Sequence, residues 1–305
     1  MYRILAFDGG GIRGMFSLIL VDRIDRQRPG WIDGADLIAG TSIGGIIALG
    51  LASGMEIPRM QELLVTIGKR IFTRQSYARR LMSSSLSSPR YSSKPLEEEL
   101  EKHFQDKRLC DIEKGVMLTS FMLDNKGAGG KRRSWGPKIF HNLDPVTGDP
   151  DVRCVDAALY TSAAPTYFPS RDGFVDGGVT ANNPSMCAYA LARNTLRNEG
   201  MDDDIALLSI GTGEANSYID ANTEGWGSIE WSKVIIPLLT DGPAKIADYQ
   251  MRAVLGRSYM RLNAAFDGSG PIGLDDIHCL RALKEAAESY DISPALEWLD
   301  STWLI

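Results

Sequence analysis

Two consecutive units of strand, glycine-rich turn and helix open the chain and constrain its fold more than any other feature. Residues 3–7 (RILAF) form a short apolar run that ends abruptly in DGGGIRG, and residues 15–24 then show helical spacing of apolar side chains. Residues 36–39 (DLIA) begin the second unit, with GTSIGG as its turn and residues 46–52 as a buried helix. Such units join parallel strands through right-handed crossovers, so the sequence predicts an α/β fold on a parallel sheet.

Further apolar runs extend this pattern. We expect strands at residues 115–121, 138–141 and 205–210, with helices near residues 96–104, 154–161 and 185–198. This order predicts a sheet that is covered by helices on both faces. The uncharged stretch 37–55 approaches the length of a membrane span, but glycines and hydroxyl side chains interrupt it, so we interpret it as strand, turn and buried helix.

Charge and cysteine content exclude some functions. The formal net charge of −6 gives no general attraction to a phosphate backbone, so we expect no nucleic-acid polymer as a partner. The cysteines are widely separated, form no CxxC pair and have no histidine at ligand spacing, which predicts reduced thiols and no metal site. The first residues lack the apolar segment of a secretory signal, so we expect a cytoplasmic protein.

Residues 40–44 (GTSIG) fit the GxSxG nucleophile elbow, a tight turn from strand to helix that exposes the hydroxyl of Ser42. A side chain at Gly40 or Gly44 would crowd the neighbouring backbone, and the helix that follows directs its positive end at the nucleophile. The pentapeptide alone is a weak signal, because glycine-rich turns after strands match it by chance.

The loop DGGGIRG, with Gly9, Gly10, Gly11 and Gly14, lets backbone N–H groups converge on an anion. That anion is either a nucleotide phosphate, since GGGIRG also fits the loose GxGxxG pattern, or the oxyanion of acyl transfer. The next strand–turn–helix unit contains the serine elbow, which favours the oxyanion. Because parallel strands end at one edge of a sheet, the loop and Ser42 are expected to share one site there.

Asp176 follows a short apolar approach in FVDGGVTANNP, where Gly177 and Gly178 allow a sharp turn. A lone DGG is usually only a turn, but an activated serine needs a proton acceptor, and no histidine of this chain lies in a recognisable catalytic context. His278 is the alternative, because Ser42, Asp176 and His278 follow the chain order of an α/β-hydrolase triad. Two features disfavour this triad. Only about two strands precede the elbow, whereas several do in an α/β-hydrolase, and the sequence around His278, LDDIHCLRAL, predicts a helix.

Five blocks in this order resemble the patatin-like phospholipase family: DGGGIRG, GTSIGG, SAAPTYFP, VDGG with ANNP, and LSIGTG. The blocks lie within about residues 1–215. The resemblance implies a three-layer α/β/α sandwich with a mostly parallel central sheet. It also implies Ser42 as the nucleophile, Asp176 as the base without histidine, and the amides around Gly9, Gly10 and Gly11 as the oxyanion hole. Residues 216–305 match no block, and we expect them to be mainly helical cover of a single domain spanning residues 1–305.

The activity implied is that of a serine lipid acyl hydrolase, a phospholipase A, lysophospholipase or carboxylester hydrolase, which works through an acyl-serine intermediate and needs no cofactor. Its partners would be a lipid or ester substrate and, transiently, a membrane surface, with peripheral association at the inner membrane face. Lipid class, acyl position and oligomeric state stay open. The alternative from another class is a nucleotide-responsive sensing or binding module whose serine is incidental.

Residues 69–96 carry seven basic and no acidic side chains, interleaved with apolar ones: Lys69, Arg70, Arg74, Arg79, Arg80, Arg90 and Lys94. This composition fits a lid over anionic headgroups, a site for an anionic regulator, or a solvated basic surface. Some bacterial patatin-like enzymes are switched on by cyclic nucleotides in antiphage defence, so the resemblance implies a cyclic-nucleotide activator and a role in antiviral defence. Arg13, Arg74, Arg79 and Arg80 are candidate headgroup or regulator contacts.

Overall fold

The first two strand–turn–helix units form as the sequence predicts. The computed structural model describes residues 1–72, 88–130, 132–144, 146–215, 219, 222–266 and 273–305. The N-terminal elements are β1 (Tyr2–Phe7), α1 (Gly14–Gln27), β2 (Leu37–Thr41) and α2 (Ile43–Ala52). The uncharged stretch therefore lies in β2 and α2 and not in a membrane span, and no helix in the described part of the chain has the length and apolar character to cross a bilayer.

The remaining elements are helices and strands in mixed order. The helices are α3 (Ile57–Ile71), α5 (Lys94–Phe104), α6 (Cys154–Thr161), α7 (Gly178–Ala181), α8 (Ser185–Asn198), α9 (Ser228–Leu255), α10 (Leu280–Ser289) and α11 (Ser293–Trp298). The strands are β3 (Gly115–Met122), β4 (Gly136–His141), β5 (Phe174–Asp176), β6 (Ile205–Ile210) and β8 (Tyr259–Leu262), with β7 (Glu214–Ala215) and β9 (Ala265–Phe266) as a separate short pair.

Among the described residues, one seven-stranded sheet runs in the order β4-β3-β2-β1-β6-β8, and β5 pairs with β3. All pairings are parallel except those that β4 and β5 make with β3, which confirms the mostly parallel sheet. The central strands are mostly apolar because helices cover both of their faces, and β2 and β6 are buried along their whole length. In β1, Ile4 and Ala6 enter one core, whereas Leu5 and Phe7 enter the core on the opposite face.

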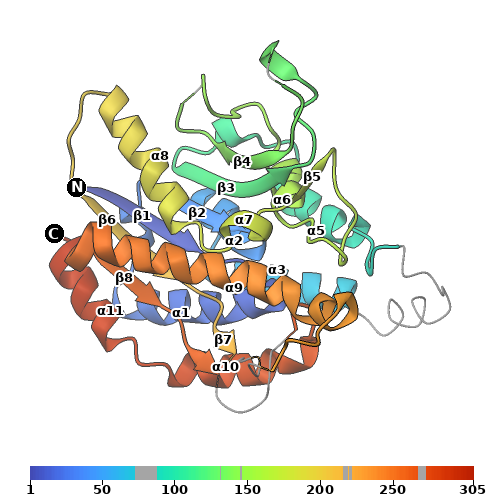
Figure 1. Ribbon diagram of the computed structural model, residues 1–305. Coiled ribbons are helices and arrows are strands. Elements are labelled where there is room, and N and C mark those ends of the chain that lie inside the picture. The colour runs from blue at the N-terminus through green and yellow to red at the C-terminus, as the bar shows by residue number, and fades with distance from the viewer. Residues whose placement is uncertain (73–87, 131, 145, 216–218, 220–221, 267–272) are drawn as a thin grey trace.

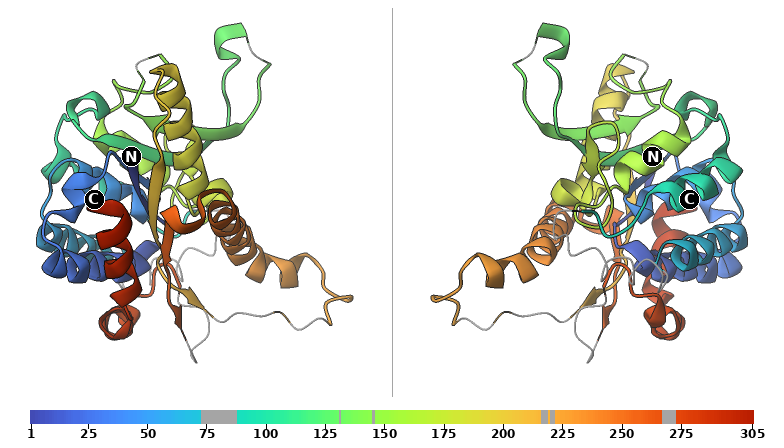
Figure 2. Two further views of the ribbon diagram at one scale, coloured as in Figure 1. Left: turned by 90° about the vertical axis from the view of Figure 1, so that its left-hand side faces the viewer. Right: turned by 90° about the vertical axis from the view of Figure 1, so that its right-hand side faces the viewer.

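Helices cover both faces of the sheet, so the architecture is the three-layer α/β/α sandwich (Figure 1). In Figure 2, α8 and α9 lie on one side of the sheet and α1, α2, α3, α10 and α11 on the other. α8 and α9 close the smaller core with Ala188, Ala192 and Met251.

The C-terminal third contains α9, α10 and α11, and it also supplies a strand that was not predicted from the sequence. β8 pairs in parallel with β6 and extends the main sheet. With four residues, of which only Tyr259 and Leu262 are buried, it gives no clear apolar alternation in the sequence. Because this strand shares the sheet of the N-terminal units, we propose that residues 1–305 form one domain.

The strand registers bring the functional loops to one edge of the sheet. Phe7, at the end of β1, is in register with Gly40 of β2 and with Ile210 of β6. The glycine loop, the serine elbow and the turn after β6 therefore leave the sheet side by side. Thr41 is in register with Thr119 of β3, whose next residue is opposite Asp176 of the antiparallel β5.

Candidate active site

Ser42 occupies the sharp turn between β2 and α2. Its backbone has φ 55° and ψ −125°, a conformation that a non-glycine residue adopts only under strong local constraint. The constraint is visible at the flanking glycines: a Cβ at Gly40 would lie 2.1 Å from the carbonyl oxygen of Gly44, and one at Gly44 would lie 2.5 Å from that of Phe7. The N–H of Ser42 donates to Thr161 Oγ1 at 2.8 Å, which fixes the turn against α6.

Asp176 ends β5 and lies beside Ser42. The Ser42 hydroxyl lies near enough to the Asp176 carboxylate to lower the pKa of that group, and the N–H of Gly178 donates to Asp176 Oδ1 at 2.7 Å. Asp176 is only 5% exposed. Burial raises the pKa of Asp176 to about 6, although the Ser42 hydroxyl and the Gly178 N–H oppose the increase. The pair is therefore a hydroxyl near a carboxylate that is more basic than a solvated aspartate.

The glycine loop presents free amides to the same site. The N–H of Gly9 already donates to the carbonyl oxygen of Asn182 at 3.0 Å. Among the described residues, no acceptor is bonded to the N–H groups of Gly10, Gly11 or Ile43, the first residue of α2. Of the three glycine amides expected around the oxyanion, those of Gly10 and Gly11 are therefore free to donate. The amide of Ile43, at the positive end of a helix, is free as well.

The other motif glycines have packing positions. Gly14 begins α1 against Ile43, where a Cβ would lie 2.8 Å from Ile43 Cγ1. Gly177 and Gly178 form the turn between β5 and α7, and a Cβ at Gly177 would lie 2.2 Å from Thr119 Oγ1. These glycines bring the backbones of neighbouring elements together rather than contacting the hydroxyl of Ser42.

A buried ion pair anchors the glycine loop to the C-terminal third of the chain. Arg261 of β8 donates to both carboxylate oxygens of Asp8, at 2.9 and 2.6 Å, and also to Ser209 Oγ at 2.7 Å. Each charged side chain is 6% exposed. Burial opposes the charge on Arg261, but the Asp8 carboxylate outweighs it and raises the pKa of Arg261 above its ordinary value. The residue before the three glycines is thus fixed by a strand about 250 residues away in the chain.

Replacing Arg261 with methionine is expected to lower the free energy of unfolding by about 3–5 kcal/mol, because it leaves the Asp8 carboxylate buried without a partner. Urea denaturation measures this change. The matched control is Arg28→Met, which breaks the exposed pair with Asp300 (2.6 Å) and is expected to leave the free energy of unfolding almost unchanged. Equal losses in the two variants would contradict the anchoring role of Arg261.

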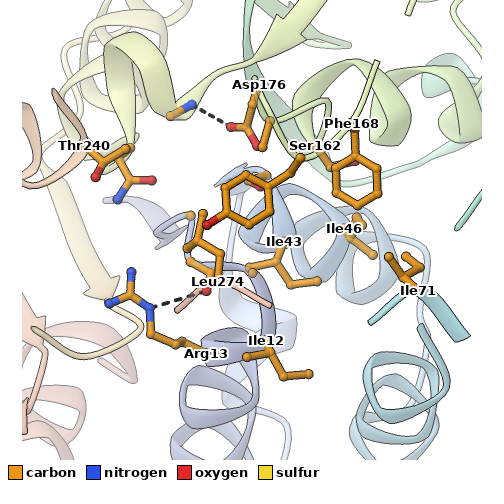
Figure 3. Close-up of a pocket in the computed structure, with 18 of the residues that line it drawn as sticks. Ile12, Arg13, Ile43, Ile46, Ile71, Ser162, Phe168, Asp176, Thr240 and Leu274 are labelled. Atoms are coloured by element: carbon orange, nitrogen blue, oxygen red, sulfur yellow. Dashed lines mark hydrogen bonds between the residues drawn. The ribbon is translucent and has the colours of Figure 1, made fainter. Parts of the chain in front are cut away.

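A cavity of about 300 Å³ opens beside Ser42 and Asp176 (Figure 3). Its walls are mostly apolar side chains from α2, α3, α5, α7, α9 and nearby loops: Ile12, Ile43, Ile46, Leu64, Ile67, Ile71, Phe72, Leu96, Phe168, Val179, Leu239 and Leu274. In Figure 3, Asp176 lies at the top of the cavity, with Ile43 below it and Ile46 and Ile71 to its lower right. Ser42 and Asp176 therefore line a largely apolar cavity that could hold an alkyl chain.

Arg13 is the basic residue that lines this cavity within the described part of the chain. Its guanidinium donates to the carbonyl oxygens of Gly10 at 3.4 Å and Gly213 at 3.3 Å, and it forms no ion pair with a described residue. Burial lowers the pKa of Arg13, while Asp241 and Asp8 oppose this effect. The other candidate contacts, Arg74, Arg79 and Arg80, lie outside the described residues.

None of the three histidines lines the cavity. His278 is exposed, and it lies in a short 3-10 turn, Ile277–Cys279, rather than in the predicted helix, which begins only at Leu280. Its backbone N–H donates to Asp276 Oδ1 at 3.0 Å. The described contacts of Asp176 come from Ser42 and Gly178, so they give the triad hypothesis no support.

The contribution of α3 to the cavity wall was not predicted from the sequence. Its signal was present, because Ile57, Met60, Leu64, Ile67 and Ile71 follow helical spacing and are buried. Ile43 lies in the GTSIGG block and Thr161 directly precedes the SAAPTYFP block, and neither residue was predicted to take part in the site. Arg261 had no local signal at all, since its partner is Asp8.

Comparisons with known proteins agree with the blocks found in the sequence. A family model described as patatin-like phospholipase matches residues 5–189. A cGAMP-activated phospholipase from Escherichia coli is 35% identical over 232 residues, which cover 69% of this chain and 62%, less than two thirds, of that protein. The putative sporulation hydrolase CotR from Bacillus subtilis is 35% identical over 229 residues, with 75% and 68% coverage. The crystal structure of VipD from Legionella pneumophila has a TM-score of 0.46 at 13% identity, covering 98% of this chain and 67% of that one.

Proposed function

Because this chain belongs to the patatin-like phospholipase family, we propose that it is a lipid acyl hydrolase that forms an acyl-enzyme at Ser42. One observation carries the proposal: Ser42, at a strained turn, and the buried carboxyl group of Asp176 line the same apolar cavity, and the Ser42 hydroxyl lies near enough to lower the pKa of Asp176. A serine beside a base is the arrangement of an activated nucleophile. The apolar cavity beside it suits the acyl chain of a lipid ester.

In the proposed first step, Asp176 accepts the hydroxyl proton as Ser42 Oγ bonds to the ester carbonyl carbon. The tetrahedral intermediate collapses, the ester C–O bond breaks, and the leaving alcohol takes the proton from Asp176. A water molecule then attacks the acyl-serine and gives a proton to Asp176. Release of the fatty acid returns that proton to Ser42. The raised pKa of Asp176 supports both roles, since the group can gain and lose a proton near neutral pH.

The oxyanion would be held by backbone amides. We propose Gly10 and Gly11 as donors, with Ile43 as a third, because their N–H groups have no acceptor among the described residues and border the cavity. The residue after the nucleophile supplies such a donor in other serine elbows. Gly9 is left out because its N–H already has an acceptor. Loss of one such donor typically costs about 3 kcal/mol of transition-state stabilisation.

For the substrate we propose a glycerophospholipid. The apolar wall would hold an acyl chain, and the Arg13 guanidinium, which lacks a carboxylate partner in the described part of the structure, would face the headgroup phosphate. Cyclic dinucleotide activation is a further part of the proposal, supported by the name of the Escherichia coli relative. It would link the activity to antiviral defence.

The experiment is fatty acid release from phosphatidylcholine vesicles, with and without added cyclic dinucleotides. We expect free fatty acid and lysophospholipid, either constitutively or only when a nucleotide is present. A protein that binds a cyclic dinucleotide but releases no acid from vesicles or from p-nitrophenyl esters would instead be a sensing module, and the hydrolase proposal would fail.

A further inference from the structure

α9 carries an apolar stripe on the side that faces solvent. Six large apolar side chains at helical spacing make up this outer stripe: Trp231, Ile235, Leu238, Leu239, Ile246 and Tyr249. Their exposed fractions rise along the helix from 39% at Trp231 to 74% at Tyr249. A surface helix normally presents polar residues to water, so a continuous stripe of this kind marks an interaction surface.

The core does not account for this stripe, because the opposite side of α9 makes the contacts with the sheet. Ala244, Ala247 and Met251 are the buried residues there, at 8%, 7% and 0% exposure. In Figure 2 the N-terminal half of α9 extends away from the rest of the molecule. The helix is therefore apolar on two opposite sides, and only one of them is used in folding.

The outer stripe is continuous with the opening of the catalytic cavity. Leu239 belongs to both, because it is 51% exposed and also lines the cavity, and its neighbour Thr240 lines it as well. α9 also packs on α7, the short helix that follows Asp176. Asn183 Nδ2 donates to the carbonyl oxygen of Ala244 in α9 at 3.5 Å. A surface that binds the stripe would lie directly at the cavity opening.

We propose that the outer stripe of α9 is a membrane-docking surface, which enters the headgroup region of a lipid bilayer and sets the cavity opening against it. This inference rests on the proposed hydrolase function, because an acyl chain has to pass from a bilayer into an apolar cavity. Contact between stripe, cavity opening and bilayer lets the chain move without crossing water. Trp231 and Tyr249 are side chains that favour the membrane interface.

The charge beside the stripe indicates which lipid surface it fits. Glu230 and Asp241 are acidic and Lys245 is basic, so these described neighbours provide no excess of positive charge. Docking would therefore depend on burial of apolar area and not on anionic lipid, and it should change little with salt. This expectation commits the surface to a zwitterionic bilayer such as phosphatidylcholine.

The test measures binding separately from hydrolysis, by sedimentation of the Ser42→Ala protein with phosphatidylcholine vesicles at low and high salt. We expect binding that does not change with salt. In the variant that also carries Ile246→Ser and Tyr249→Ser, we expect the affinity for vesicles to fall by at least about tenfold. The matched control carries Trp135→Ser and Val146→Ser, which are 76% and 88% exposed on the distant β4 region, and should bind as before. With an intact Ser42, the Ile246/Tyr249 double variant should hydrolyse a soluble p-nitrophenyl ester normally and lose vesicle hydrolysis.

The inference fails if the Ser42→Ala protein does not sediment with vesicles, or if the Ile246/Tyr249 substitutions leave sedimentation unchanged. It also fails if the wild type is a dimer that these substitutions dissociate, because the stripe would then bind a second copy of the chain. Failure of the hydrolase proposal looks different: the wild type would sediment with vesicles but hydrolyse neither the soluble ester nor the lipid.

Discussion

Replacing Ser42 with alanine is expected to lower kcat/KM for ester hydrolysis by about 10⁴-fold or more. In the proposed mechanism the substitution removes the atom that forms the acyl-enzyme, and the remaining amides and cavity would only bind and polarise the ester. The fold should tolerate the change, since the strained turn at Ser42 is held by Gly40, Gly44 and Thr161 rather than by its hydroxyl. Initial rates with p-nitrophenyl butyrate measure the loss, and circular dichroism checks the fold.

Ser162 provides the matched control for that variant. It also lines the cavity, but its hydroxyl donates to the carbonyl oxygen of Ala158 at 2.6 Å and contacts no base in the described structure. Ser162→Ala should therefore retain most of the activity. If Ser42→Ala stays active and Ser162→Ala does not, the nucleophile has been assigned to the wrong serine.

Replacing Asp176 with asparagine is expected to reduce kcat by about 10³-fold, because asparagine keeps the shape and the hydrogen bond from Gly178 but cannot accept the hydroxyl proton. In the wild type, the same group predicts a pH profile. Below a pKa of about 6 the carboxyl is protonated and cannot act as a base, so kcat/KM should fall tenfold for each further pH unit. The asparagine variant should lack this acidic limb in its residual activity.

Asp176→Asn, which is expected to lower activity, is expected to raise the stability of the fold. The pKa of Asp176 is higher in the folded protein, about 6, than in the unfolded chain, 3.8, so ionisation destabilises the fold as the pH rises through this range. At pH 7 the full cost, about 2–3 kcal/mol, is present in the wild type and absent in Asp176→Asn. The variant should therefore melt at a higher temperature than the wild type at pH 7, and the difference should shrink toward pH 4.

His278→Ala separates the two-residue mechanism from a triad. Its side chain is exposed and outside the cavity, so the variant should keep wild-type turnover. A near-complete loss of turnover in His278→Ala with an intact fold, together with an active Asp176→Asn, would exclude the two-residue mechanism.

The N-terminal half of the site could be predicted because its information is local. A glycine loop after β1 and a serine elbow after β2 leave parallel strands at the same edge, so their proximity follows from topology alone. Asp176 was predicted only through the resemblance of the five sequence blocks to a known family, because DGG by itself is a common turn. Its approach to Ser42 depends on an antiparallel pairing of β5 with β3 that no sequence spacing specifies.

The missed features depend on contacts between distant segments. Arg261 is one arginine among many until β8 places it against Asp8, which leads into the glycine loop. The outer stripe of α9 was missed for another reason: apolar spacing in a sequence normally marks the buried side of a helix, and here it also marks an exposed one. Whether an apolar face is buried is decided by the packing of the whole fold.

The most direct test of the central claim is covalent labelling with a fluorophosphonate, followed by mass spectrometry of the peptide that contains Ser42. The probe phosphonylates a serine only where a base activates the hydroxyl and amides hold the developing oxyanion. We predict one label per chain, located on Ser42, formed more slowly in Asp176→Asn and prevented by excess lipid substrate. An active preparation that carries no label on Ser42, or a label on another serine, would contradict the assignment of the acyl-enzyme to this residue.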